Sequence, residues 1–198
     1  MARGTLQHPG SVAADGRLLA YSEVGTNTKE DIWILPLEPE GEPRIFLQTP
    51  ASEGFPALSP EGRLLAYQSD ESGQQEVYLR SFPDGGSKVQ VSAGGGIEPV
   101  WARSGKELFY RAPLQGRQRR FMVVDVSPGN PIRVSRGRGL FEDSYEVVGL
   151  NLGTPNYDVF PDGQHFVMVE TNREASRITH FNVIVNWFEE LKRLVPPK

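Results

Sequence analysis

Cysteine is absent from the 198 residues of this chain. Its absence excludes disulfides, thiol catalysis and cysteine-ligated zinc, although it does not determine the compartment. No stretch approaches eighteen consecutive apolar residues, so we expect no membrane-spanning helix in the chain. The first nine residues also lack the apolar region of a signal peptide. A formal net charge of only −4 argues against a polyanion ligand for the chain as a whole.

Motifs that carry hydrolytic, phosphoryl-transfer or metal chemistry are missing too. The chain has no Gly-x-Ser-x-Gly nucleophile elbow and no His-Glu-x-x-His zinc motif. Its histidines, His8, His165 and His180, are scattered, and no Lys-Ser/Thr follows the glycines at 94–96. Asp15 could bind calcium at a turn, but equivalent turns carry Glu and Ser, which favours a role in the turn itself. We therefore expect no catalytic residue, no metal site and no cofactor.

Glycine (21 residues) and proline (16 residues) are abundant, which indicates many short elements joined by turns. One phrase occurs four times: a polar residue, then a glycine, then an apolar run. The copies begin at Asp15, Glu61, Ser104 and Asp162, with spacings of 46, 43 and 58 residues. The longer third spacing predicts an insertion within 137–157.

Each copy is followed by further apolar runs separated by polar turns. The runs predicted as strands include 31–35, 44–47, 76–80 and 88–92, and 76–80 alternates like a half-buried strand. About four short strands in 40–45 residues is typical of a propeller blade. We therefore predict an all-β fold, a β-propeller of four blades or a partial ring, over the single domain 1–198. The predicted repeats are about 8–55, 56–98, 99–156 and 157–186; a β-sandwich is the alternative.

The end of the chain differs from the repeats. Asn186 is a candidate N-cap with Glu189 as its capping-box partner, and Pro196 would end the helix. The sequence therefore predicts a short C-terminal helix over 187–195. Its apolar residues lie at helical spacing, so it would either cover the end of a blade or dock a partner.

The segment 58–67 resembles the signature of WD40-like PD40 repeats, which form the propeller of TolB and of prolyl-oligopeptidase-type enzymes. Four further segments, and the ending 186–191, resemble the C-terminal propeller region of bacterial membrane-anchored serine/threonine protein kinases. These four segments are 31–37, 46–50, 76–83 and 94–101.

The resemblance implies a sensor or interaction domain that lies outside the cytoplasm, in the periplasm, in the parent protein. Kinase activity does not transfer, because the kinase Gly-rich loop, His-Arg-Asp segment and Asp-Phe-Gly are absent from this sequence. Four repeats are also fewer than a closed ring usually has. Such a resemblance implies fold more strongly than function.

Positive charge is concentrated in the third repeat. Residues 103–138 carry nine basic and two acidic side chains, so this segment is +7 and the rest of the chain is −11. Arg117, Arg119 and Arg120 are the candidate contacts for an anionic ligand there, although solvated loop charge is the simpler interpretation. Few aromatic residues are interleaved with these arginines, so nucleic acid is not the expected partner.

Propeller blades are radial, so the first strand of each blade lines a central channel and the segments entering these strands surround its mouth. We expect a protein or polymer ligand at that mouth. The expected binding rim consists of Glu53, Phe55, Glu98, Tyr157 and Asp158.

The leading functional hypothesis is a non-catalytic recognition or scaffold module, the sensor part of a kinase-type protein. One alternative is a fragment of the gating propeller of a prolyl-oligopeptidase-type peptidase; another is a polyanion-binding protein that uses the basic third blade. Because four repeats could form an open arc, a homodimer that completes a ring is a further expectation.

Overall fold

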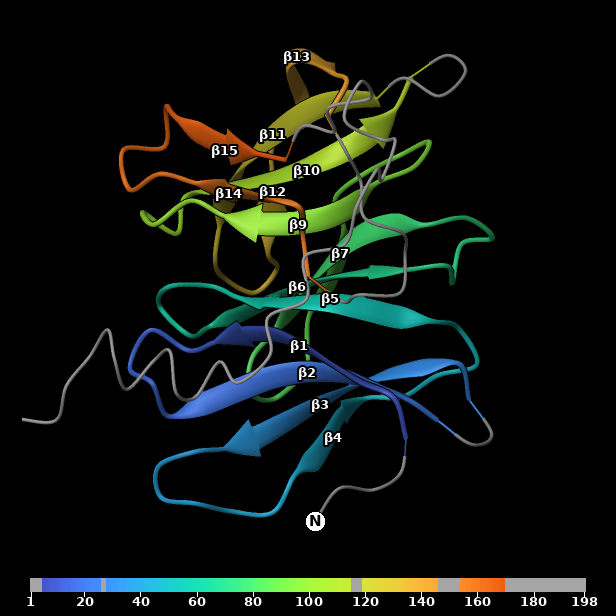
Figure 1. Ribbon diagram of the computed structural model, residues 1–198, viewed down its shortest axis with the longest axis vertical. Helices are drawn as coiled ribbons and strands as arrows, with labels where there is room; N and C mark the ends of the chain where they lie inside the picture. The colour runs from blue at the N-terminus through green and yellow to red at the C-terminus, as the bar shows by residue number, and fades with distance from the viewer. Residues whose placement is uncertain (1–4, 26–27, 115–118, 146–153, 170–198) are drawn as a thin grey trace, which may run out of the picture.

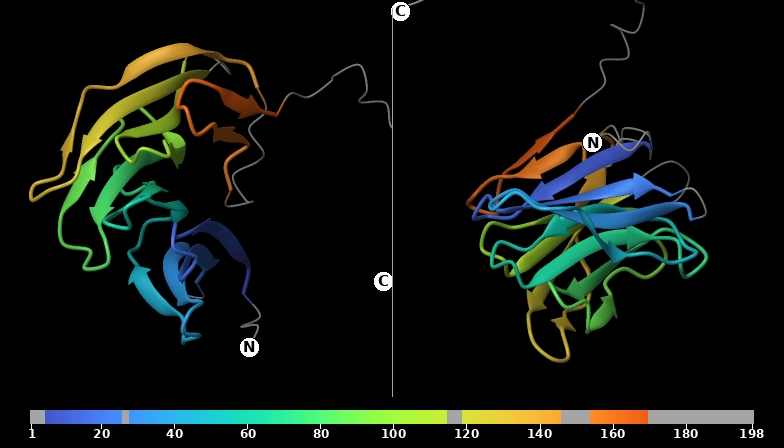
Figure 2. Two further views of the ribbon diagram at one scale, coloured as in Figure 1. Left: turned by 90° about the vertical axis from the view of Figure 1, so that its left-hand side faces the viewer. Right: turned by 90° about the horizontal axis from the view of Figure 1, so that it is seen from below.

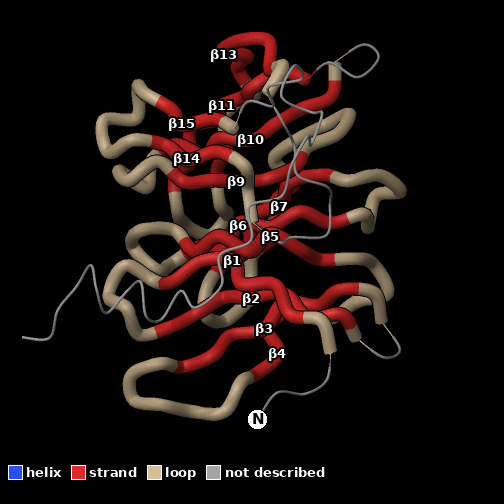
Figure 3. Tube along the Cα trace, in the orientation of Figure 1, coloured by secondary structure: helices blue, strands red, loops and turns tan. Residues whose placement is uncertain are grey.

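The computed structural model describes residues 5–25, 28–114, 119–145 and 154–169. Every regular element in these residues is a β-strand (Figure 3). No helix among them is long and apolar enough to cross a membrane. The predicted C-terminal helix over 187–195 lies outside the described residues, as does most of the fourth repeat. The expected all-β propeller is confirmed for the described part.

The first two blades are four-stranded antiparallel sheets with their strands in sequence order (Figure 1). The first blade consists of β1 (Gln7–Val12), β2 (Leu18–Val24), β3 (Glu30–Pro36) and β4 (Arg44–Leu47). The second consists of β5 (Glu53–Leu58), β6 (Leu64–Ser69), β7 (Glu76–Ser81) and β8 (Lys88–Gln90). The runs predicted at 31–35, 44–47, 76–80 and 88–92 fall on β3, β4, β7 and β8.

The outer position of the third blade is divided between two strands. The blade consists of β9 (Ile97–Trp101), β10 (Glu107–Pro113), β11 (Arg119–Ser127), β12 (Arg133–Val134) and β13 (Arg138–Asp143). β12 pairs with the end of β11 at Val126 and Ser127, whereas β13 pairs with its first half. Part of the predicted insertion over 137–157 therefore forms β13, and 146–153 lies outside the described residues.

The fourth repeat begins with the hairpin β14 (Tyr157–Val159) and β15 (Phe166–Met168). The blades follow one another around an open arc, with the first blade at one end and this hairpin at the other (Figure 2). Blade two begins at Glu53 and blade three at Ile97, three and two residues before the predicted repeat starts. Pro56 and Pro99 lie inside these first strands, where a bulge in each strand accommodates them.

The turn between the first and second strands is the same in all four blades. Its glycine has a positive φ: 75° at Gly16, 65° at Gly62, 69° at Gly105 and 67° at Gly163. In blade two the Gly62 amide donates to the carbonyl of Ser59 (2.8 Å), and the Ser59 amide donates to that of Leu64 (2.9 Å). Equivalent bonds recur in the other three blades. The repeated phrase in the sequence is therefore this turn.

The hydrophobic core consists of three clusters, one between each pair of successive blades. The second strand of an inner blade lies between the two neighbouring blades. Both of its faces are therefore apolar, and its sequence is a continuous apolar run. In β6, Leu65 and Tyr67 pack toward blade one, while Leu64 and Ala66 pack toward blade three. Each blade thus depends on its neighbours for burial.

We expect Gly62→Ala to destabilise the fold by about 1–2 kcal/mol, because an alanine is strained in the left-handed region. No heavy atom lies within 4 Å of the added Cβ, so backbone strain alone would cause the loss. Urea unfolding followed by tryptophan fluorescence measures it. Gly86→Ala is the matched control: its φ is not left-handed, its nearest neighbouring atom would be 3.5 Å away, and its stability should be unchanged. Equal effects of the two changes would contradict this account.

Candidate functional site

A groove of about 680 Å³ runs along the inner side of the arc. It is lined by the first strand of every blade: β5 contacts both β1 and β9, and β9 contacts β14. Its walls are largely small, apolar or proline residues, with Arg103 and Asp158 as its charged side chains. This is the position of the channel in a propeller, here open on one side because the arc is open (Figure 2).

Three side-chain hydrogen bonds join the first strands of successive blades along the groove. Ser11 accepts from the amide of Leu58 (2.8 Å), which joins blade one to blade two. The Trp101 indole donates to the carbonyl of Ala57 (3.0 Å), and the Tyr157 hydroxyl donates to that of Glu98 (2.6 Å). First strands of different blades do not pair as a sheet, so these side chains satisfy backbone groups that would otherwise be buried without partners.

The predicted rim residues divide into two groups. Phe55, Tyr157 and Asp158 line the groove, and of these only Asp158 is exposed. Glu53 and Glu98 are fully buried and do not line it. The segments expected to enter the first strands were 53–55, 97–98 and 156–158. They lie instead within these strands, 53–55 in β5, 97–98 in β9 and 157–158 in β14. Phe55 and Glu98 occupy equivalent positions before a proline, and both have a positive φ near 55°.

Glu98 belongs to a buried ion cluster within blade three, which Tyr157 of blade four contacts. Arg111 Nη1 lies 3.0 Å from Glu98 Oε2, and Arg111 Nε lies 2.7 Å from Asp143 Oδ2. The guanidinium also lies over the Tyr157 ring, 5.1 Å from its centroid. Burial raises the pKa of Glu98, although the charge of Arg111 lowers it. Glu98 is thus committed to contacts within the protein.

Sequence reasoning placed Arg111 among the surface charges of the basic segment, whereas it is fully buried. The repeats contain a signal that was missed. Arg111 stands six residues after its turn glycine, as Ser22 and Gln68 do in the other blades, and all three side chains are buried. Gln68 accepts a hydrogen bond from the amide of Glu98 (3.2 Å). This position therefore carries a buried polar side chain in each of the first three blades.

Arg111→Met should destabilise the protein by about 3–5 kcal/mol, because Glu98 and Asp143 would be left buried without their cation. Urea unfolding at neutral pH measures the loss. Arg120→Met is the control, since Arg120 lies exposed on the neighbouring strand β11 and should contribute less than about 1 kcal/mol. Similar losses in the two variants would show that the buried cluster has no special role.

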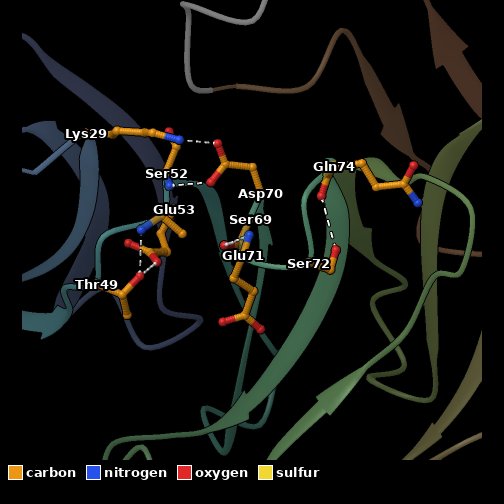
Figure 4. A network of polar contacts seen from close by, with 10 residues as sticks. Lys29, Thr49, Ser52, Glu53, Ser69, Asp70, Glu71, Ser72 and Gln74 are labelled. Atoms are coloured by element: carbon orange, nitrogen blue, oxygen red, sulfur yellow. Dashed lines mark hydrogen bonds and ion pairs between the residues drawn. The ribbon is translucent and has the colours of Figure 1, made fainter.

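Glu53 lies at the junction of blades one and two, in the polar network of Figure 4. Its Oε1 accepts from the Thr49 hydroxyl, while its Oε2 has no hydrogen-bond partner among the residues that the structure describes. Nearby, Lys29 of blade one binds Asp70 of blade two (2.5 Å), and Asp70 also accepts from the amide of Ser52 (2.8 Å). Burial raises the pKa of Glu53 to about 7, and the negative charge of Asp31 raises it further.

A raised carboxyl pKa means that the folded state holds a proton that the unfolded state releases. The stability of the protein should therefore decrease between about pH 4.5 and 7 by up to about 3 kcal/mol from this group, and level off above pH 7. Glu53→Gln keeps the acceptor for Thr49 and removes the titration. We measure the free energy of unfolding of variant and parent by urea unfolding from pH 4.5 to 8. Relative to the parent, the variant should become more stable as the pH rises through this range. A difference independent of pH would contradict the assignment.

The three arginines proposed as anion contacts do not form one cluster among the described residues. Arg117 lies outside the described residues. Arg119 and Arg120 are adjacent on β11, so their side chains point to opposite faces of the sheet. Arg119 is half-buried and lines a small cavity near Arg111, whereas Arg120 is exposed.

One histidine lies in a cluster with a hydroxyl and a carboxylate, but in an order that does not fit a catalytic triad. His8 Nδ1 lies 3.0 Å from Glu30 Oε1, and the Ser22 hydroxyl donates to the same oxygen. In a nucleophile–base–acid triad the imidazole stands between the other two groups. Here the carboxylate stands between them, joining β1, β2 and β3. Among the described residues, no three His, Asp or Glu side chains are grouped so as to hold a metal ion.

Three radial blades and the hairpin β14–β15 surround an axial groove, and this arrangement defines the described part of the chain as a β-propeller. No family model matches the chain, and no curated protein matches its sequence. The fold is similar to that of a putative TolB from Agrobacterium tumefaciens, with 20% identity and a TM-score of 0.56; the match covers 69% of this chain and 49% of that chain. TolB from Acinetobacter baumannii has 17% identity and a TM-score of 0.60, over 83% of this chain and 37% of that one.

An oligogalacturonate lyase solved in complex with manganese has 16% identity and a TM-score of 0.60, over 83% of this chain and 46% of that chain. At these identities the likeness concerns the fold, which is that of the TolB-type β-propellers expected from the repeats. The matches span less than half the length of each of these neighbours. The association with kinases stays a prediction.

Proposed function

We propose that this chain is a non-catalytic recognition module that binds an extended segment of a protein or polymer in the axial groove. The observation that carries the proposal is the convergence of four first strands on one open groove of about 680 Å³. Such a groove buries a chain-like ligand along its length, and the blades fix its walls rigidly. Arg103 and Asp158 supply opposite charges for orienting that ligand.

The proposal is tested with peptides selected from a displayed random library on the purified chain. We expect the selected peptide to bind the parent by calorimetry, and Arg103→Ala to weaken its Kd about tenfold, equivalent to about 1.4 kcal/mol. Arg44→Ala is the matched control, because Arg44 is also exposed but lies on the outer strand β4. Mass spectrometry of the bound peptide should find it intact.

Two results would overturn the proposal. If both arginine variants bound the peptide as the parent does, the groove would not be the site. If the peptide were cleaved, the module would not be a passive binder. A third result would favour an anion site on the basic third blade. In that case heparin would bind in a salt-dependent manner, and Arg120→Ala would weaken this binding whereas Arg103→Ala would not. Salt dependence is expected because contacts to sulfate or phosphate groups are screened by salt.

Within a longer protein, we infer that the module is the sensor part of a kinase-type protein. The support is the resemblance of segments 31–37 and 94–101 to kinase-associated propellers. The β-propeller domain of the trilobed protease from Pyrococcus furiosus has a TM-score of 0.51 and 18% identity, over 70% of this chain and 43% of that one, so a peptidase context is the competing proposal. The full coding frame decides between them: a kinase domain before the propeller supports the first, and a hydrolase domain supports the second.

A further inference from the structure

Each blade has one face toward the blade before it and one toward the blade after it. The face toward the preceding blade carries a leucine and a tyrosine, three and five residues after the turn glycine. In blade two these are Leu65 and Tyr67, and in blade three Leu108 and Tyr110; all four are buried between blades. Blade one, which lies at the end of the arc (Figure 2), has the same pair, Leu19 and Tyr21, in its second strand β2.

The outer face of blade one is built like an interblade face, but no blade within the described residues packs against it. Val12 is 55% exposed, whereas the equivalent Leu58 and Trp101 are 7% and 8% exposed. Ile45, which shares this face through its pairing with Trp33, is 45% exposed. A groove of about 390 Å³ opens on the face, lined in part by Leu19, Tyr21 and Leu35.

The opposite end of the arc presents the complementary kind of face. In β15, Phe166 and Met168 pack on blade three, so Val167 points away from it and is 53% exposed. Val167 is four residues after its turn glycine, the position of Ala20 and Ala66 in blades one and two. Both alanines are fully buried against the next blade. At the first two junctions, small and aliphatic side chains on this face therefore oppose a leucine and a tyrosine.

We propose that a second copy of this chain covers the outer face of blade one with its β14–β15 blade, and that the two copies close one ring. Each copy offers one face of each kind, so a two-fold arrangement satisfies both ends at once and leaves no open end. The match spans 49% and 37% of the lengths of the two TolB neighbours, so this chain alone covers less than half of either fold. The inference is independent of the proposed groove ligand.

The first test is the mass in solution, measured by light scattering over a range of concentrations. We expect twice the chain mass of 22.0 kDa for the parent, and a single chain for Ile45→Asp and for Val167→Asp. Neither side chain lines the axial groove, so these variants separate ring closure from ligand binding. Leu140→Asp is the control: Leu140 is 39% exposed on β13 and away from both faces, and its variant should remain a dimer.

A parent that stays a single chain at every concentration would overturn the proposal. So would a dimer that Ile45→Asp and Val167→Asp leave intact. Circular dichroism of the variants checks that they fold, which their exposed positions favour.

The second test defines how the two copies are arranged. Because the chain has no cysteine, an introduced cysteine is the only thiol that can react. Ile45→Cys and Val167→Cys chains are mixed and treated with a flexible thiol-to-thiol crosslinker. We expect crosslinked dimers from the mixture and none from either variant alone. Dimers from Ile45→Cys alone would indicate that two first blades meet face to face, which contradicts the head-to-tail ring. A double variant that crosslinks only within one chain would show that the chain closes on itself, and would also overturn the proposal.

Discussion

Burial between neighbouring blades is the constraint on which the rest of the structure depends. A single four-stranded sheet with apolar side chains on both faces cannot bury them alone. The three core clusters each lie at a junction of two blades, and none lies within a single sheet. The stability of any blade therefore includes the surface of its neighbours. The same constraint makes the two ends of the arc chemically unlike the rest of the surface.

Polar contacts at these junctions are arranged around that apolar packing. Near the axis, Ser11, Trp101 and Tyr157 each bond a backbone group of the adjacent blade. Charged groups are buried as well: retention of a proton lowers the cost of burying Glu53, and ion pairs lower the cost of burying the Arg111 cluster. These contacts specify how one blade sits on the next, which apolar surfaces alone would leave loosely defined. The axial groove takes its shape from that registration.

Several candidate residues acquired a different role once the blades were placed together. Glu98 was expected at an exposed rim because it is charged and precedes a proline. It is buried beside Arg111, thirteen residues later, which also pairs with Asp143 from the inserted strand β13. No local pattern in the sequence pairs these three residues. Phe55 and Tyr157, in contrast, do line the groove. Their location could be predicted because each first strand immediately precedes the repeated turn.

The sequence alone determined the blade and its repetition. A glycine with positive φ, a polar residue before it and an apolar run after it are local requirements, so four copies of the phrase predict four copies of one turn. The strands at 31–35, 44–47 and 76–80 were predicted for the same reason, because each is an apolar run bounded by polar turns, and 76–80 also alternates. Only the tertiary structure decided which charges are buried, where the groove opens and which apolar faces have no neighbour among the described residues. Those properties depend on contacts between residues far apart in the chain, which periodicity and composition do not encode.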